Sequence, residues 1–225
     1  MRRIVFRRLG WREARLDILI YIIIGFVIGL ALGRRRFLFR SFQNDGEAYL
    51  SKEIQRLFSA PDYHLMNHVT LKLEGGTTQI DHILISKFGV FVIETKDYNG
   101  WIFANAKHAN WTQVLFHVKS RFQNPIFQNF RHVRTVQEKL DFLPSDAIKS
   151  AVVFVGKAEF KTEVPAGVFN LLEFIDYVRE QTTEIMSRNR MEFCIGRLEA
   201  ARQAITNKTD VEHIENLRRK YGYRD

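Results

Sequence analysis

The sequence contains very little cysteine, because Cys194 is the single one among 225 residues. One thiol cannot form an intrachain disulfide, and it excludes zinc or iron–sulfur sites that need several cysteines. We interpret Cys194 as a buried structural thiol. The chain also lacks a glycine-rich phosphate loop and the strained serine turn of the α/β-hydrolases. We find neither an internal repeat nor a low-complexity tract.

The positive charge of the chain is concentrated near its beginning. The formal net charge is +9, and hydrophobic residues make up 46% of the chain, which is enough for one globular domain and a small appendage. Residues 1–40 hold ten arginines against two acidic residues, which leaves 24 basic and 23 acidic residues in the remainder. The net charge therefore says little about a substrate, since arginines beside an apolar segment suit lipid head groups.

Residues Ile18 to Leu32 form an uncharged apolar run of fifteen positions. A helix of that length measures about 23 Å, short of the roughly 30 Å hydrocarbon core of a bilayer. Arg15 and Arg34 can extend the span by reaching the head groups. The run predicts a single transmembrane helix at about 16–33, within an N-terminal segment 1–40. A cleaved signal peptide is the alternative, but Arg34 to Arg36 resemble a stop-transfer flank and favour a retained anchor.

The orientation of this anchor stays open. Six arginines precede the apolar run and four follow it. A strict count places the N-terminus in the cytoplasm and the domain outside.

From Asn44 onward the pattern is that of an α/β domain. An apolar stripe containing Leu50, Ile54 and Phe58 predicts a helix over 46–58, and Pro125 suits the first turn of a helix that runs to about Leu140. Turn signals separate segments with strand patterns. The predicted strands are Tyr63–Leu73, Thr78–Ser86, Val90–Lys96, Gly100–Phe103, Trp111–Val118 and Ala151–Val155. We predict one domain over 41–160 and a helical extension over 161–225, in which Leu171, Leu172, Phe174, Ile175 and Val178 pack inward.

Polar residues interrupt two of the apolar strands, and these residues are candidates for metal binding and catalysis. Side chains alternate along a strand, so Glu94 and Lys96 emerge on the same side at its end. Asp81 on a neighbouring strand and Glu47 on the preceding helix bring two further carboxylates. Carboxylate oxygens are the ligands that Mg²⁺ prefers, and a lysine beside the ion can activate water and stabilise charge on a phosphate.

Each residue has an ordinary alternative interpretation. A Glu-x-Lys at a strand end is commonly an exposed ion pair, and Glu47 alone suits a solvated position. Asp81 within an apolar strand is harder to explain, because an unpaired buried carboxylate is costly. His82 points to the face opposite Asp81, and His108, His117 and His132 match no zinc spacing.

These residues resemble the motifs of the nuclease-related domain, or NERD, family. The likeness extends from Gly46 to about Leu140 and rests on Gly46-Glu47, Ile80-Asp81-His82-Ile83 and Ile93-Glu94-Thr95-Lys96. Gln128 matches the glutamine typical of the helix after the site strands. The family belongs to the PD-(D/E)xK superfamily, so the resemblance implies a restriction-endonuclease-like fold, with a mixed central sheet flanked by helices, and a Mg²⁺ (or Mn²⁺) site. It implies Glu47, Asp81 and Glu94 as ligands, and Lys96 and Gln128 as further catalytic residues.

A second feature does not depend on this resemblance. From Tyr98 to Gln137 there is no acidic residue. Aromatic residues alternate there with basic ones, which can supply phosphate contacts and stacking surfaces. The basic residues of interest are Lys107, Lys119, Arg121, Arg131 and Arg134. The alternative is that most of the aromatic rings belong to the core.

The sequence thus predicts a membrane-anchored, metal-dependent nuclease that hydrolyses phosphodiester bonds of nucleic acid, with DNA preferred. The alternatives are a catalytically idle nucleic-acid-binding module and a membrane scaffold domain with the same fold. RNA as substrate, strand form, sequence preference and oligomeric state stay open.

Overall fold

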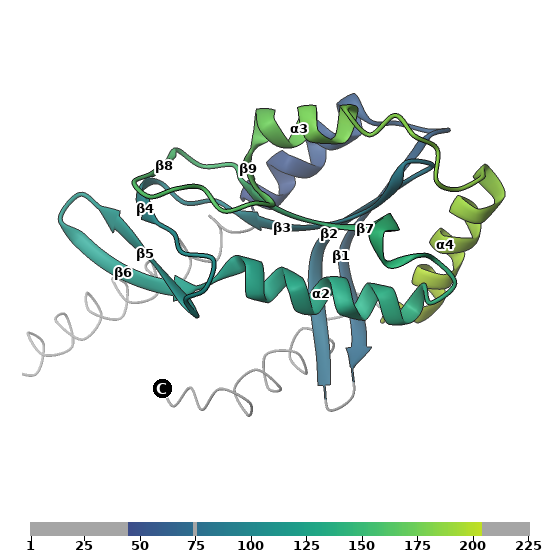
Figure 1. Ribbon diagram of the computed structural model, residues 1–225, viewed down its shortest axis with the longest axis horizontal. Helices are drawn as coiled ribbons and strands as arrows, with labels where there is room; N and C mark the ends of the chain where they lie inside the picture. Colours follow the sequence, from purple (N-terminus) through teal and green to yellow (C-terminus); the bar gives the residue numbers. More distant parts are fainter. Residues whose placement is uncertain (1–44, 74–75, 204–225) are drawn as a thin grey trace, which may run out of the picture. The chain divides into compact units, whose positions relative to one another are not determined.

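The computed structural model describes residues 45–73 and 76–203. These residues form two β-sheets with helices around them (Figure 1). A first helix covers residues 45–57, as predicted. The remaining elements are β1 (Tyr63–Leu73), β2 (Gly76–Ser86), β3 (Gly89–Lys96), β4 (Gly100–Phe103), β5 (Asn110–Leu115), β6 (Val118–Gln123), α2 (Pro125–Lys139), a 3₁₀ turn (Ser145–Ala147), β7 (Ile148–Phe154), β8 (Ala158–Phe160), β9 (Val168–Asn170), α3 (Leu171–Arg179) and α4 (Arg188–Ala201).

The larger sheet has five strands in the order β1-β2-β3-β7-β9. The first three strands form an antiparallel meander, whereas β7 runs parallel to β3 and β9 parallel to β7. The predicted α/β class and the three-stranded meander are confirmed. The sheet is mixed, and its central strand β3 is buried along its whole length.

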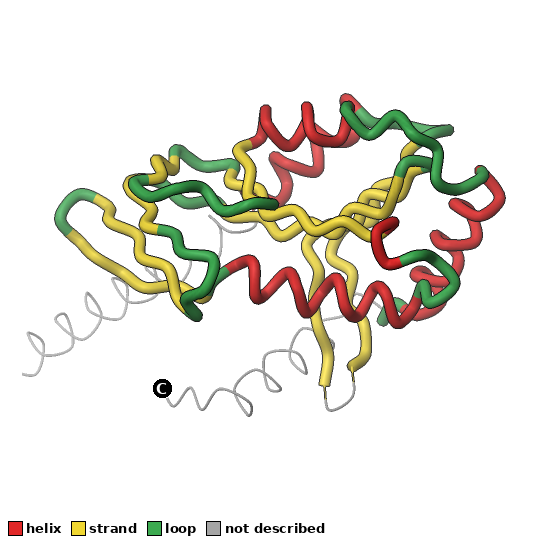
Figure 2. The backbone as a smooth tube through the Cα atoms, in the orientation of Figure 1, coloured by secondary structure: helices red, strands yellow, loops and turns green. Residues whose placement is uncertain are grey.

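Helices cover both faces of this sheet, as the tube in Figure 2 shows. Helix 45–57 and α3 pack on one face, where Ile54 and Phe174 meet Phe91. Helices α2 and α4 pack on the other, where Val133 and Leu198 join the cluster of Val92. Burial on both faces explains why β3 is almost continuously apolar, and why polar side chains on it require a separate explanation.

The smaller sheet has four strands in the order β6-β5-β4-β8. Strands β5 and β6 form a hairpin, so the single strand predicted over Trp111–Val118 is correct to Leu115 and wrong from Phe116 onward. The turn falls at Phe116, which adopts a left-handed conformation with φ of 55°. Tight hairpin turns usually place Gly, Asn or Asp in this conformation. A phenylalanine gives no such signal in the sequence.

Helix α2 starts where the sequence predicts. Asn124 is the N-cap, because its side chain accepts the backbone N–H of Ile126 at 2.9 Å, and Pro125 occupies the first turn. The side-chain amide of Asn124 also donates to the carbonyl of His108 at 2.8 Å. The helix start is therefore tied to the loop that precedes β5.

The C-terminal part contributes a strand as well as helices. β9 extends the larger sheet, and Asn170 then starts α3 with a capping box that includes Glu173. Four of the five apolar residues predicted to pack inward from α3 are buried or partly buried, but Leu172 is 71% exposed. The prediction for Leu172 is wrong because that position lies away from the apolar stripe of Phe174, Ile175 and Val178.

No helix within residues 45–73 and 76–203 is long and apolar enough to cross a membrane. The transmembrane helix predicted at about 16–33 lies outside the described residues.

Candidate active site

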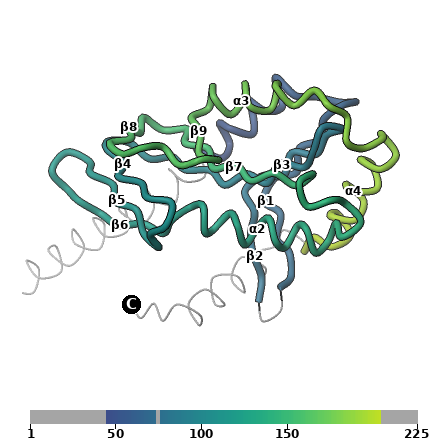
Figure 3. Tube along the Cα trace, viewed as in Figure 1, coloured from purple at the N-terminus to yellow at the C-terminus, as the bar shows by residue number. Residues whose placement is uncertain are grey.

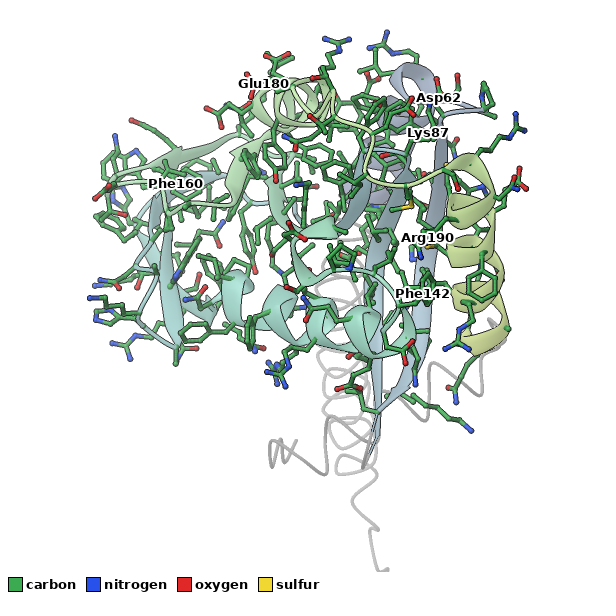
Figure 4. The ribbon with its side chains drawn as sticks, turned by 45° about the vertical axis from the view of Figure 1, so that its right-hand side comes forward. Asp62, Lys87, Phe142, Phe160, Glu180 and Arg190 are labelled. Carbon is green, nitrogen blue, oxygen red and sulfur yellow. The ribbon has the colours of Figure 1, made fainter. Side chains whose placement is uncertain are left out.

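Glu94 and Lys96 lie on one face at the end of β3 and are almost fully buried, at 1% and 7% exposed. The ammonium of Lys96 lies 2.5 Å from Oε1 of Glu94. The pair differs from an ordinary surface contact such as that of Lys87 with Asp62, which is labelled in Figure 4, where the atoms are 3.3 Å apart and both side chains are more open to solvent. Burying two charges is costly, and pairing them offsets part of that cost. Because both side chains are buried, Glu94 and Lys96 are not an ordinary exposed ion pair at a strand end.

Asp81 on β2 lies opposite Glu94. The β2–β3 register pairs His82 with Ile93, and one step further along both strands brings Asp81 and Glu94 together on one face. His82 lies on the other face, and its Nδ1 is 2.7 Å from Oδ1 of Asn67. Asp81 accepts the backbone N–H of Thr95 at 2.7 Å through Oδ2, which holds its carboxylate beside the end of β3.

The β1–β2 ladder is interrupted beside Asp81. Pairing continues on either side through Asn67 with His82 and Val69 with Ile80, but His68 is unpaired and has a left-handed φ of 50°. This backbone conformation is unusual for a residue with a β-carbon. It directs Nδ1 of His68 to within 3.3 Å of a Glu47 carboxylate oxygen.

Glu47 reaches this region from the first turn of helix 45–57. The turn lies close to the end of β3, since a β-carbon added to Gly46 would lie 2.6 Å from Cβ of Asp97. Only glycine permits that approach without displacement. The sequence pair Gly46-Glu47 therefore combines a close contact with a carboxylate at the candidate site.

Helix α2 closes the site from the side of the sheet that carries Glu94. Gln128 accepts a hydrogen bond from Lys96 Nζ at 3.3 Å. The next residue, Asn129, is fully buried and donates to the carbonyl of Val92 at 2.9 Å and the hydroxyl of Ser150 at 2.8 Å. These bonds fix the first turns of α2 against β3 and β7, and so determine where Gln128 lies.

His132 is a site residue that sequence reasoning missed. It is 4% exposed, its Nδ1 lies 2.8 Å from the hydroxyl of Thr78, and its Nε2 lies 3.2 Å from Oε2 of Glu94. These last two atoms are close but not in hydrogen-bond alignment, so Oε2 has no hydrogen-bond partner among the described residues. The available signal was the spacing of four residues from Gln128, which places both on one helix face.

The site contains more acidic groups than basic ones, and this excess shifts their pKa values. Burial, and then the charges of Glu94 and Glu47, raise the pKa of Asp81 well above its ordinary value. Burial and the charge of Glu94 raise the pKa of Glu47 to about 7. Burial also opposes ionisation of Glu94, but Lys96 and His132 outweigh it and lower its pKa. Burial disfavours the charged form of Lys96, whereas Glu94 and Asp81 raise its pKa overall.

The donor set suits a hard divalent cation. Three carboxylates with mutual repulsion face one ammonium, and Glu94 presents a buried oxygen without a hydrogen-bond partner. Such oxygen donors are those that bind Mg²⁺ together with water. In the part of the chain that the structure describes, no three acidic, histidine or cysteine side chains are already arranged around a metal position. Binding an ion would therefore require the carboxylates of Glu47, Asp81 and Glu94 to come closer together around it.

The basic residues predicted to contact nucleic acid lie outside this buried cluster. All five are exposed, with Lys119 and Arg121 on β6, Arg131 and Arg134 on α2, and Lys107 in the loop before β5. The guanidinium of Arg134 lies 6.0 Å from the ring centre of Phe130. The structure thus separates a buried acidic cluster from an exposed basic surface.

The structure is that of a mixed α/β domain in which acidic residues and a lysine meet on the adjacent central strands β2 and β3. The chain belongs to the nuclease-related domain family, whose model matches residues 43–155. That range contains Glu47, Asp81, Glu94, Lys96 and Gln128.

One similar protein is an uncharacterized protein of Bacillus anthracis. It is 48% identical to this chain over 90 residues, which are 38% of this chain and 42% of that protein. The chain therefore matches less than half the length of this relative. No solved structure matches the chain.

Proposed function

We propose that this protein is a metal-dependent nuclease that hydrolyses phosphodiester bonds of nucleic acid, with DNA as the preferred substrate. The observation that carries the proposal is the cluster of the buried Glu94 and Lys96 with the partly buried Asp81 and Glu47, whose charges act on one another. Membership of the nuclease-related family supports the same activity. The antiparallel meander followed by a parallel strand also agrees with a restriction-endonuclease-like fold.

Each residue has a role that follows from its position. Asp81, Glu94 and Glu47 would hold Mg²⁺ or Mn²⁺, which supplies Lewis-acid stabilisation of the phosphate and acidifies bound water. Lys96, buried beside Glu94, orients the attacking water and offsets negative charge that grows on the phosphate. Gln128 accepts from Lys96 and fixes the direction of its ammonium. His132, whose Nε2 lies 3.2 Å from the second oxygen of Glu94, helps to lower the pKa of that carboxylate.

The location of the activity is part of the proposal. An N-terminal helix at about 16–33 would anchor the nuclease in a membrane as a single-pass protein, with the domain in the cytoplasm if cellular DNA is cut. The ten arginines of residues 1–40 support an anchor beside lipid head groups but do not assign the domain to one side of the membrane.

A second candidate function is a catalytically idle nucleic-acid-binding domain. The observation that favours it is the short contact between Lys96 and Glu94, which occupies a proposed ligand oxygen. A domain of this kind would bind nucleic acid through its exposed basic residues and would not respond to metals.

A cleavage assay on the full-length chain separates the two functions. End-labelled single- and double-stranded DNA and RNA are incubated with Mg²⁺, Mn²⁺, Ca²⁺ or chelator. We expect cleavage with Mg²⁺ or Mn²⁺, none in chelator, and binding without efficient cleavage in Ca²⁺, whose looser coordination positions water poorly. Cleavage by no metal on any substrate would refute the nuclease proposal.

Variants purified in parallel distinguish this activity from a contaminating nuclease. Lys96→Ala should abolish cleavage with little loss of nucleic-acid binding. Asp81→Asn should lose metal binding and cleavage together. Asp146→Asn makes the same substitution at an exposed position outside the site and should cut like the wild type. Equal cutting by all variants would assign the activity to a contaminant.

A further inference from the structure

The four-stranded sheet has two chemically different faces. Its register pairs Trp101 with Val114 and Val114 with Lys119, which forms one row across β4, β5 and β6. A second row on the same face joins Phe103, Thr112 and Arg121. Partners opposite each other project to the same side of a sheet. Two aromatic and two basic side chains therefore share one face, which we call the outer face.

The inner face is part of the hydrophobic core. Ile102 and Trp111 project to it and are 0% and 1% exposed, and they pack with Phe154 of the larger sheet. Phe160, labelled in Figure 4, joins them from β8. Core packing explains these residues but not the outer face, where Trp101 is 48% exposed and Phe103 is 40% exposed.

The outer face also extends to β8. Glu159 lies opposite Trp101, and Lys161 follows two residues later. The ammonium of Lys161 lies 4.8 Å above the Trp101 ring and forms an ion pair with Glu159. The ring is thus held between two polar neighbours, and Glu159 is the single acidic residue in these cross-strand rows.

We propose that the outer face binds single-stranded nucleic acid, with bases stacked on Trp101 and Phe103 and phosphates contacted by Lys119, Arg121 and Lys161. Stacking on aromatic side chains requires unpaired bases, because a duplex hides its base faces. The two rings are two residues apart on one strand, about 7 Å, or roughly twice the rise between stacked bases in one DNA strand. Each ring therefore takes its own base. The ion pair of Lys161 is exposed and weak, so a base can displace this lysine from the ring towards a phosphate.

This inference rests on the proposed nuclease function and specifies that the nuclease acts on single strands.

The backbone connects the four-stranded sheet to the acidic cluster at two places. Gly100 at the start of β4 follows Lys96 by four positions, a span of at most about 14 Å. β6 leads through Asn124 into α2, which carries Gln128, and Figure 3 shows the trace at this end of α2. A strand bound on the outer face lies near enough to extend to the acidic cluster.

Binding is measured separately from cleavage. The full-length chain in chelator is titrated into labelled oligothymidine, oligouridine and a DNA duplex, with fluorescence anisotropy as the readout. We expect tighter binding of the single strands than of the duplex. Trp101→Ala and Phe103→Ala should each weaken single-strand binding about tenfold, whereas Trp101→Phe should retain most of it. Phe193→Ala removes an aromatic ring that is 55% exposed on α4 and should have no effect.

Salt dependence tests the phosphate contacts. The double variant Lys119→Ala/Arg121→Ala should reduce the slope of log affinity against log salt by about 1.4, since each phosphate contact to a single strand contributes about 0.7. Arg179→Ala/Arg188→Ala removes two exposed arginines from α3 and α4 and should leave the slope unchanged.

The outcomes separate this inference from the nuclease proposal. Single-strand binding that the ring variants weaken, without metal-dependent cutting, supports the outer face and refutes the nuclease. Cutting by a chain whose ring variants keep wild-type single-strand affinity overturns the outer face alone. Duplex binding as tight as single-strand binding also overturns it. If the same variants instead weaken binding to anionic phospholipid vesicles, and no oligonucleotide binds, the face contacts a membrane and the inference is wrong.

Discussion

The two sheets of this domain use charge in opposite ways. In the five-stranded sheet, Glu94 and Lys96 are buried, bonded to each other and surrounded by further ionisable groups. In the four-stranded sheet, Lys119 and Arg121 are exposed and share their rows with aromatic rings. Buried charges determine stability and chemistry because they cannot be hydrated, whereas exposed charges mainly determine what the protein attracts. We therefore propose that the reaction takes place at the five-stranded sheet and that the four-stranded sheet captures the substrate.

The strongest test of this difference removes one lysine from each sheet. Lys96→Met leaves Glu94 buried without its cation, which should destabilise the fold by about 3–5 kcal/mol. Lys119→Met removes an exposed charge and should change the free energy of unfolding by less than about 0.5 kcal/mol. Denaturant unfolding of both variants in chelator measures the two values. Similar changes in the free energy of unfolding for both variants would show that the buried pair contributes no more to stability than an exposed lysine.

A matched pair of tryptophans tests the two faces of the smaller sheet. Trp111→Ala empties a fully buried position and should cost about 3–5 kcal/mol. Trp101→Ala, on the outer face, should cost about 1 kcal/mol or less, since its ring is half exposed and its cation–π contact is weak. Thermal unfolding of the two variants measures both losses of stability. A large loss at Trp101 would identify this ring as structural.

A glycine pair tests the close approach at the candidate site. Gly46→Ala places a β-carbon against Asp97, which should cost about 1–3 kcal/mol and weaken metal binding by displacing Glu47. Gly196→Ala lies within α4 with no neighbour within 4 Å of the added carbon, so it should stabilise the helix by about 0.5–1 kcal/mol. Equal effects at both positions would contradict the packing described at Gly46.

The smallest effect concerns Cys194, which should be inert in the folded protein. It is fully buried, and burial raises the pKa of its thiol to about 11. The thiolate is the reactive form, so iodoacetamide at pH 8 should label the native chain far more slowly than the urea-unfolded chain. A cysteine introduced by Glu199→Cys, at an exposed position of the same helix, should react rapidly. Rapid labelling of Cys194 would show that α4 opens readily.

Much of the larger sheet was predictable because its signals are local. The meander follows from apolar strands separated by Gly75-Gly76 and by Gly89, and helix α2 follows from Pro125. The β5–β6 hairpin was not predictable, because its turn residue Phe116 adopts a left-handed φ without the usual glycine or asparagine. Leu172 was misplaced because hydrophobicity alone does not give the direction in which a helical side chain points.

The carboxylates and the lysine of the candidate site were predictable because they lie on consecutive elements of the chain. Glu94 and Lys96 lie two positions apart on one strand, and Asp81 and Glu47 lie on the strand and the helix before it. The family resemblance added Gln128. His132 was missed because its role depends on α2 lying against β3, a contact made by Asn129 across 37 positions of sequence. The outer face needed the register of three strands, which brings Trp101 and Lys119 into one row.

The most direct test of the central claim is a crystal structure of the protein soaked with Mn²⁺, with the ion located by anomalous scattering. We expect a peak bonded to carboxylate oxygens of Asp81 and Glu94 at about 2.2 Å, with Glu47 bound directly or through water. Lys96 should have moved from Glu94 Oε1 while staying beside Gln128. Absence of a peak there at millimolar Mn²⁺, with the Lys96–Glu94 contact intact, would contradict the proposed metal site.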